Sequence, residues 1–376
     1  MRTLQRIAAA IALAAAASAS AGDWGFTQPH QGPRAVYTQT NASAGNEILV
    51  FRRAQNGDLQ LAATVPTRGI GTDGGLGNQG SLLLRRDGRR LYAVNAGSND
   101  ISVFAARSHG LVMIERVSSG GTRPISLTLH DDTLYVLNAG DAATGAAANI
   151  TGFYIGDDRR VRPIADSTRA LSAAHPGPAQ IEFDPWGGTL VVTEKGTNKI
   201  DLFDVADGVA GPASVRVSNG QTPFGFAFDK RGRLIVSEAF GGAANASALS
   251  SYELDDAASP LEVISGSVPT HQTAACWVVV TKDGRFAYTT NTGSGSISAY
   301  RISRAGRLVL LDADGVTAAT GAGPIDIALS SDGQFLYSLN SGDGTLSAFR
   351  LRADGHLSRI STEIGLPGSA NGLVAY

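Results

Sequence analysis

Residues 81–104 read SLLLRRDGRRLYAVNAGSNDISVF, and residues 327–349 repeat the pattern as IALSSDGQFLYSLNSGDGTLSAF. Each copy contains an apolar stretch, an Asp-Gly turn, a second apolar stretch that ends in Asn95 or Asn340, a polar loop and a third apolar stretch. Short stretches rich in Val, Leu, Tyr and Phe are typical of strands joined by tight turns. A unit of this size cannot bury its own apolar faces, so it must stack on neighbouring copies.

Seven copies of the unit can be counted from the residue that ends each second strand. These positions are Thr40 or Asn41, Asn95, Asn138, Glu194, Glu238, Asn291 and Asn340. From Asn95 onward they are 43 to 56 residues apart, which is typical of one four-stranded blade per unit. Residues 373–376 resemble a first strand with no second, and residues 36–40 a second strand with no first. We therefore predict an all-β, seven-bladed β-propeller of four-stranded antiparallel blades, closed by pairing of the N- and C-terminal strands; six or eight blades are the alternatives.

The first residues have the pattern of an export signal. Arg2 and Arg6 precede an apolar run over residues 7–17, and small residues at 19–21 suit a cleavage site. We predict a signal peptide over residues 1–21, an N-terminal extension over 22–34 and the propeller over 35–376, with an uncleaved anchor as the alternative. The protein is then expected in the periplasm or the medium, without a membrane anchor after cleavage.

The charge, cysteine and histidine content of the chain limits the kinds of partner and cofactor that we expect. The formal net charge is −2 and no basic block is present, so nucleic acid is a poor partner. The sole cysteine, Cys276, excludes a disulfide within the chain. The histidines are scattered, with none at metal-ligand spacing, so we expect no metal and no cofactor. We expect a monomer.

The predicted topology locates a site. In each blade the start of the first strand and the end of the second meet on one face of the ring. Aligning the units puts seven residues at one equivalent position on this face: Ser81, Ser126, Gln180, Gly225, Trp277, Asp326 and Gly372. Ligand sites favour such concave mouths, so this end of the channel is where we expect the site.

Three residues near the predicted mouth are candidates for catalysis. Glu194 and Glu238 end second strands where most other units place Asn, and a buried carboxylate there suits a general base toward water. Arg123, which precedes a first strand, would hold a substrate carboxylate or stabilise an oxyanion. The alternatives are that the glutamates cap loop amides and that Arg123 forms a salt bridge between blades.

Nine further residues near the mouth are candidates for substrate binding. They are Gln79, Asn95, Asn138, Gln180, Phe224, Trp277, Asn291, Asp326 and Asn340. The polar members would orient a sugar or acid substrate, and the two aromatic residues would stack on a ring. The alternatives are hydrogen bonds to ordered water and packing between blades.

These features resemble the seven-bladed lactonase family, which contains bacterial 6-phosphogluconolactonases and fungal 3-carboxymuconate lactonising enzymes. The stretch TEKGTNKI at 193–200, and Cys276-Trp277 followed by TNTGS at 290–294, resemble a secreted bacterial subgroup. The resemblance implies formation or opening of a cyclic ester without metal or organic cofactor. Residues 177–179 replace the family's His-Pro-His run, residues 222–225 replace Gly-Pro-Arg-His, and Glu238 keeps the family's acid.

Two functions follow from these observations. The first is an exported lactonase-like enzyme that hydrolyses or forms the lactone of a sugar acid or an aromatic-derived acid, so that its partner is a small-molecule lactone or organic acid. The alternative is a non-catalytic periplasmic propeller that binds a ligand or an envelope protein through the same face. The altered family positions, together with long loops over residues 139–149 and 239–247, favour the alternative.

Overall fold

A computed structural model describes residues 34–376. The predicted signal peptide, and all but the last residue of the predicted N-terminal extension, lie outside the described residues. Within residues 34–376, no helix is long and apolar enough to cross a membrane.

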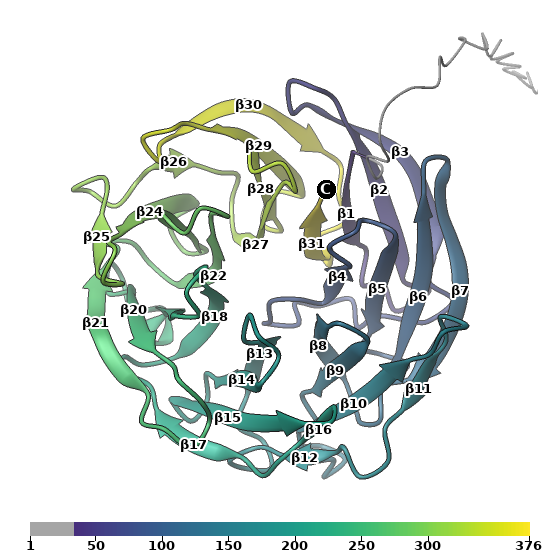
Figure 1. Cartoon of the computed structure of the whole chain (residues 1–376). Coiled ribbons are helices and arrows are strands. Elements are labelled where there is room, and N and C mark those ends of the chain that lie inside the picture. Colours follow the sequence, from purple (N-terminus) through teal and green to yellow (C-terminus); the bar gives the residue numbers. More distant parts are fainter. Residues whose placement is uncertain (1–33) are drawn as a thin grey trace, which may run out of the picture. The chain divides into compact units, whose positions relative to one another are not determined.

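Seven antiparallel sheets stand around a central channel, and each contributes its first strand to the channel wall (Figure 1). Blades 1 to 3 contain β31 (Asn371–Ala375), β1 (Ala35–Gln39), β2 (Glu47–Arg53) and β3 (Leu59–Pro66); β4 (Leu82–Leu84), β5 (Arg90–Asn95), β6 (Asp100–Arg107) and β7 (Gly110–Ser118); and β8 (Pro124–His130), β9 (Thr133–Asn138), β10 (Asn149–Ile155), β11 (Val161–Pro163) and β12 (Arg169–Ala170). Blades 4 and 5 contain β13 (Pro178–Phe183), β14 (Thr189–Glu194), β15 (Lys199–Ala206), β16 (Val209–Ala210) and β17 (Ser214–Val217); and β18 (Pro223–Phe228), β19 (Leu234–Glu238), β20 (Ala248–Glu253) and β21 (Glu262–Pro269). Blades 6 and 7 contain β22 (Ala275–Val280), β23 (Phe286–Asn291), β24 (Ser296–Ile302), β25 (Leu308–Leu310) and β26 (Ala318–Ala319); and β27 (Pro324–Leu329), β28 (Phe335–Asn340), β29 (Thr345–Leu351) and β30 (Leu357–Ile364).

The two ends of the chain close the ring as predicted. β1 pairs antiparallel with β31, with Tyr37 opposite Val374 and Thr38 opposite Leu373 (Figure 1). Because β31 supplies the first strand of blade 1, the blade combines both ends of the described chain and leaves no open edge at the closure. The count of seven four-stranded blades is confirmed. Six of the second strands end at the predicted Asn or Glu, whereas β1 ends at Gln39, just before the predicted Thr40 or Asn41. The single helical element among the described residues is η1 (Phe240–Gly242).

A tyrosine in the middle of the second strand fastens one blade to the next. The Oη atoms of Tyr135, Tyr288 and Tyr337 donate to the carbonyl oxygens of Gly208, Gly355 and Gly57, at distances of 2.9, 2.8 and 3.0 Å. Each glycine lies in the turn before the outermost strand of the following blade. The tyrosine rings are fully buried, so their hydroxyls need such a partner. Tyr92 at the same position of blade 2 is equally buried, but its hydroxyl has no hydrogen-bond partner among the described residues.

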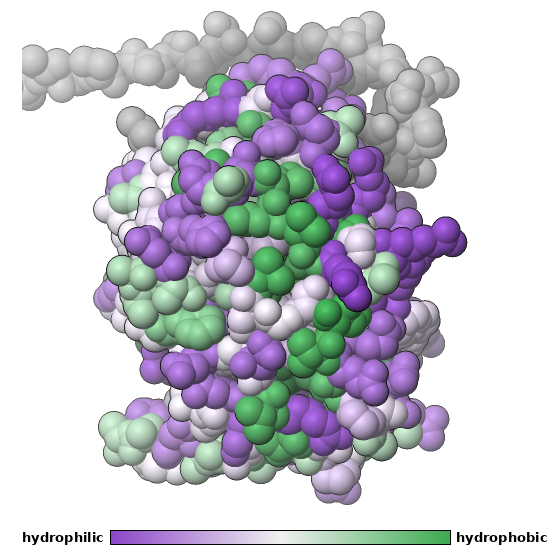
Figure 2. Space-filling model, turned by 90° about the vertical axis from the view of Figure 1, so that its left-hand side faces the viewer, coloured by the Kyte–Doolittle hydropathy of each residue, from purple (hydrophilic) through white to green (hydrophobic). Residues whose placement is uncertain are grey.

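The outer rim is less apolar than the interior but carries exposed β-branched side chains. Val263 on β21 is 49% exposed and Val309 on β25 is 57% exposed. Figure 2 views this side of the ring and shows apolar residues in a band between hydrophilic ones. The outermost strands therefore do not reproduce the nearly complete burial of the second strands.

Substitution of Gly57 tests the contact between blades. Gly57 has φ +98°, and an added Cβ would overlap the ring of Phe335, which is buried and cannot move aside. We expect Gly57→Ala to lower the free energy of unfolding by about 1–3 kcal/mol more than Gly110→Ala. Gly110 lies at the equivalent turn of blade 2 with φ +126°, and its added Cβ meets no atom within 4 Å. Urea unfolding measures both, and equal losses would contradict the packing argument.

Candidate functional site

The predicted mouth of the channel is occupied by the chain's own residues. The connection between β3 and β4 runs across the centre of the ring (Figure 1). The amide of Gln79 binds the main chain of β22 twice, donating to Val278 O at 2.8 Å and accepting from Val278 N at 3.0 Å. Its backbone N–H donates to Ala179 O on β13 at 3.1 Å. Gly225 leaves room for this arrangement, because a Cβ there would overlap the Gln79 amide oxygen.

Other residues hold the same connection in place. The indole of Trp277 donates to Asn78 O at 2.7 Å, and the Asn78 amide donates to Ile125 O on β8. The Lys195 ammonium donates to Gly77 O and Pro178 O, each at 2.8 Å. Burial lowers the pKa of Lys195 to about 8, because an ammonium away from water is disfavoured. Residues 76–80, which we call the crossing segment, therefore contact blades 3, 4 and 6.

The two aromatic candidates lie beside this segment. The rings of Phe224 and Trp277 have centroids 5.0 Å apart, and both side chains are buried. The Lys195 ammonium lies 5.4 Å from the Phe224 centroid, at cation–π distance. Burial raises the pKa of the neighbouring Cys276 to about 12, so its thiol stays protonated at neutral pH.

The strand-end asparagines bind their own blades. The amide nitrogens of Asn95, Asn291 and Asn340 donate to side chains on the third strand, five and seven residues further along the chain. Asn138 donates to Ser119 O and to Asn149 Oδ1. All four are fully buried. Each joins the second strand to an adjoining strand or loop, and their role in substrate binding stays a prediction.

Glu194 belongs to a buried carboxyl pair inside blade 4. It accepts hydrogen bonds from Ser172 N at 3.0 Å, from Ser172 Oγ at 2.5 Å and from Thr197 Oγ1 at 2.5 Å. Asp201 on β15 accepts from the same Ser172 N–H at 2.9 Å. Burial, together with the adjacent Glu194, raises the pKa of Asp201 to about 8. The ionised form of Asp201 is therefore disfavoured beside Glu194.

Glu238 and Arg123 lie in different surroundings. Glu238 is fully buried in blade 5 and accepts from Gly220 N at 2.8 Å, Ser250 Oγ at 2.5 Å and Ser267 Oγ at 2.6 Å. Burial raises its pKa. Arg123 is exposed and its backbone N–H donates to Asn99 Oδ1 at 2.8 Å. Among the described residues it forms no ion pair, so the alternative of a salt bridge between blades is absent there.

Two large cavities open at the other end of the first strands. One, of about 540 Å³, is lined by β4, β8 and β13 with Asp326 and Leu373. The other, of about 660 Å³, extends from β18 and β22 to the turns at 281–285 and 330–333. Gln79 and Glu182 line both, so the cavities are two lobes that meet in the channel. Of the predicted site residues, Gln79, Gln180 and Asp326 line them.

Glu182 was not anticipated from the sequence, although a signal was present. It lies two residues after Gln180 on β13, and side chains two apart on a strand share a face. At the aligned position the other blades place Leu83, Thr128, Ala227, Val279, Ala328 and Val374. A single acid at a position where the other blades place small or apolar residues is a sequence signal for a functional residue on the channel wall.

The channel contains two carboxyls whose charged forms are disfavoured. Burial raises the pKa of Glu182 to about 8, although Arg86 and a 2.9 Å hydrogen bond from Gln180 Nε2 oppose the shift. Burial also raises the pKa of Asp326 well above its usual range, and Ile327 N donates to it at 2.8 Å. Gln180 is held by two hydrogen bonds to Phe226, at 2.8 and 3.0 Å. The charged form of each acid is therefore disfavoured, and Glu182, with a pKa of about 8, is mostly protonated at neutral pH.

Basic side chains stand at the open end of the lobes. Arg85, Arg86 and His130 line the smaller lobe, and Lys282, Arg285 and Arg352 line the larger one. Arg86 is exposed and forms no hydrogen bond or ion pair with another described residue. Within residues 34–376, no group of three or more His, Cys, Asp or Glu side chains is placed to hold a metal ion.

The sequence matches the family model described as lactonase, seven-bladed β-propeller, over residues 30–149 and 259–371. The chain belongs to this family. Residues 177–179, residues 222–225 and Glu238 all lie in the stretch between the two matched regions. No curated protein sequence matches the chain.

Solved structures share this propeller fold. The periplasmic gluconolactonase of Pseudomonas aeruginosa is 17% identical, with a TM-score of 0.66 and coverage of 91% of this chain and 99% of that one. A proposed 6-phosphogluconolactonase from Bacteroides uniformis is 18% identical, with a TM-score of 0.69 and coverage of 91% and 99%. A Lactobacillus plantarum protein is 16% identical, with a TM-score of 0.68 and the same coverage. At these identities the likeness establishes the fold.

The environment of Glu182 predicts a pH-dependent stability. Because its pKa is about 8 in the folded chain and 4.5 ordinarily, the folded state binds more protons between these values. The contribution of Glu182 to the free energy of unfolding therefore falls as the pH rises from 4.5 to about 8. We expect Glu182→Gln to become progressively more stable than the wild type across this range.

Urea unfolding at several pH values measures the difference. Glu253→Gln, the same substitution at an exposed carboxyl on β20, serves as the control and should follow the wild type. A constant difference between Glu182→Gln and the wild type from pH 4.5 to 8 would contradict the raised pKa of Glu182.

Proposed function

We propose that this protein hydrolyses or forms the lactone of a sugar acid or an aromatic-derived acid in the central channel, without a metal, after export to the periplasm or the medium. Membership of the lactonase family supports the reaction class. The observation that carries the location is Glu182, a channel carboxyl with a pKa of about 8 beside two lobes large enough for a small ligand.

The reaction needs one group to accept a proton and one to donate it. Water attacks the lactone carbonyl carbon as the ionised Glu182 takes a proton from that water. The ring C–O bond then breaks, and the protonated Asp326 gives its proton to the leaving alkoxide. The products are a carboxylic acid and a hydroxyl on one molecule, and a proton passes from Glu182 back to Asp326 through solvent. Lactone formation is the reverse.

Substrate charge would be met at the open end of the smaller lobe. Arg86 has an exposed guanidinium without a partner among the described residues, and its charge reaches Glu182. A substrate carboxylate there would form a two-fold hydrogen bond with the guanidinium plane. The same charge favours the ionised form of Glu182 that the reaction requires.

A second location for the same chemistry is the opposite rim, with Glu238 or Glu194 as base and Arg123 facing the oxyanion. Family resemblance at Glu238 supports it. Each of these glutamates already accepts three hydrogen bonds from its own blade and from the connection that leads into it. A substrate would have to displace those donors, so we favour the channel.

Turnover on a panel of sugar and aromatic-derived lactones distinguishes the two locations. We expect Glu182→Gln to lower kcat/KM by about 10²–10⁴-fold, the usual contribution of a general base. Wild-type kcat/KM should rise with pH and reach half its maximum near the Glu182 pKa of about 8, because only the ionised form accepts a proton. Glu238→Gln should retain activity, with Glu253→Gln as the exposed control.

The results of these assays distinguish the channel site from the opposite rim and from a protein without activity. Loss of activity in Glu238→Gln but not in Glu182→Gln would place the base at the opposite rim. No turnover above buffer on any lactone would instead support the alternative, a propeller that binds a ligand or an envelope protein without changing it. The occupation of the predicted mouth by the crossing segment is the observation that favours this alternative.

Export makes a separate prediction. Cleavage after Ala21 should give a mature chain that begins at Gly22. Fractionation of the native host followed by N-terminal sequencing measures this. A chain that keeps residues 1–21, or that stays in the cytoplasm, would overturn the export proposal.

A further inference from the structure

A cluster of basic side chains surrounds a separate cavity between blades 5 and 6, on the rim that carries the turns between first and second strands. The cavity is about 200 Å³ and is lined by five cations and two acids. The cations are Lys230, Arg231, Arg233, Arg285 and Arg304, and the acids are Asp229 and Asp283. None of these residues takes part in the proposed reaction.

One buried ion pair builds the floor of this cavity. Asp229 Oδ2 accepts from Arg233 Nε at 2.8 Å and from Arg233 Nη2 at 2.5 Å, and both side chains are buried. Asp229 Oδ1 accepts from the backbone amides of Arg231 and Arg233. The charge of Asp229 is therefore already matched by Arg233, and it neutralises none of the other cations.

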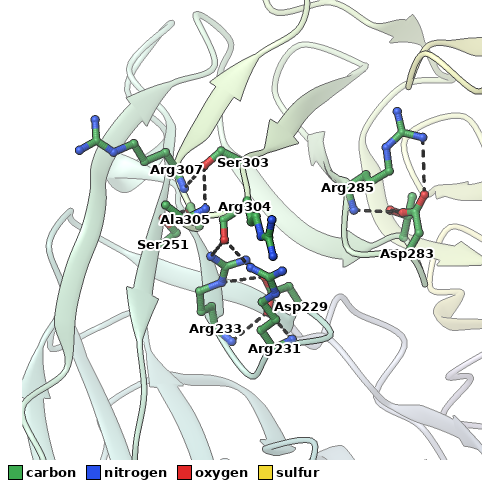
Figure 3. Close-up of polar contacts among 12 residues, drawn as sticks. Asp229, Arg231, Arg233, Ser251, Asp283, Arg285, Ser303, Arg304, Ala305 and Arg307 are labelled. Atoms are coloured by element: carbon green, nitrogen blue, oxygen red, sulfur yellow. Dashed lines mark hydrogen bonds and ion pairs between the residues drawn. The ribbon is translucent and has the colours of Figure 1, made fainter.

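The turn of blade 6 is fixed against that pair. Arg304 O accepts from Arg231 Nη1 at 2.5 Å and from Arg233 Nη1 at 3.1 Å (Figure 3). Gly306 permits this approach, because a Cβ there would lie 2.7 Å from Arg233 Nη1. Ser251 Oγ donates to Gly306 O at 2.8 Å, which ties the turn to β20. The backbone that carries the Arg304 side chain is thus held at a fixed position beside Arg231.

Positive charge is left over in this cavity. The guanidinium of Arg304 and the ammonium of Lys230 form no hydrogen bond or ion pair within residues 34–376. Arg231 donates one side-chain hydrogen bond, and that one goes to a neutral carbonyl. Burial alone would raise the pKa of Asp283, but hydrogen bonds from Thr281 and Arg285 and the charges of Arg285 and Lys230 bring it below its usual value.

We propose that this cavity binds a tetrahedral oxyanion, a phosphate or sulfate group that is either free or carried on a sugar. Guanidinium groups bind such anions through paired charge-assisted hydrogen bonds, and several gathered cations repel one another until an anion joins them. Arg304 and Arg231 would supply the donors, Lys230 a point charge, and Arg233 the support. The proposal does not depend on the lactonase reaction.

The proposed oxyanion site lies next to the larger lobe of the channel. Asp283 and Arg285 line both this cavity and the larger channel lobe. A ligand held by its oxyanion here would have the rest of its structure directed along that rim. Figure 3 shows Arg285 and Asp283 on the turn beside the arginine cluster.

Binding measurements on the whole chain test the site. Isothermal titration at constant ionic strength, with chloride as the balancing anion, would use inorganic phosphate, inorganic sulfate, glucose 6-phosphate and glucose as probes. We expect saturable binding of the oxyanions and none of glucose. Arg304→Ala and Arg231→Ala should each weaken oxyanion binding about tenfold, the effect of losing a hydrogen bond to a charged group.

Arg307→Ala is the matched control. Arg307 lies on the same turn as Arg304, and its substitution removes the same charge. It does not line the cavity, and its side chain points away from Arg231 in Figure 3. Tighter binding of glucose 6-phosphate than of inorganic phosphate identifies a sugar-borne group, and the reverse identifies the free anion. Circular dichroism checks the fold of each variant, and Arg231→Ala serves if Arg304→Ala does not fold. Absence of oxyanion binding to the wild type, or equal weakening in Arg307→Ala, would overturn the proposal.

Discussion

The amide of Gln79 forms two hydrogen bonds with the main chain of Val278, and the crossing segment lies inside the channel because of that contact. An unpaired amide in a protein interior is costly, so a glutamine that satisfies both of its groups on one strand is held firmly. The contact occupies the end of the channel where first strands begin. The two lobes that the described residues enclose lie toward the other end, and Gln79 forms part of the wall of each.

A second glutamine along the channel forms the same kind of paired hydrogen bond with a main chain. The Gln180 amide binds the main chain of Phe226 twice, as Gln79 binds that of Val278, so each glutamine pairs with the main chain of a blade to which it does not belong. The tyrosine hydroxyls do the equivalent further out, from second strand to neighbouring turn. Blades without disulfides are therefore joined by polar side chains whose partners are backbone groups, and these bonds leave the inner wall rigid.

Rigidity and burial explain the chemistry available at the centre. A carboxyl on an inner strand is desolvated by the surrounding protein and has no cation at bonding distance, so its charged form is disfavoured, as at Glu182 and Asp326. At the rim the reverse holds, because the turns carry Arg86 and the arginine cluster of blades 5 and 6 into solvent. Acids with raised pKa values inside the channel and cations at its entrance suit an anionic ligand that loses or gains a proton there.

Much of the fold was predictable from the sequence, because it depends on local pattern. The Asp-Gly turns, the apolar alternation and the strand-end Asn and Glu positions define each strand pair within about twenty residues, and the partial units at the two ends imply closure. The blade count and the pairing of β1 with β31 follow from these features alone. Placement of Gln180 and Asp326 on the channel wall also follows, since strand periodicity decides which face a side chain takes.

Only the tertiary structure decided where the channel is filled and where its cavities lie. Nothing in residues 76–80 signals that they cross the ring, because the bonds that hold them there join positions about two hundred residues apart, such as Gln79 and Val278. The raised pKa of Glu182 likewise arises from surroundings supplied by other blades, and the arginine cluster unites turns from two blades. Local pattern specifies strands and their order, whereas cavities and shifted protonation depend on what distant segments bring into contact.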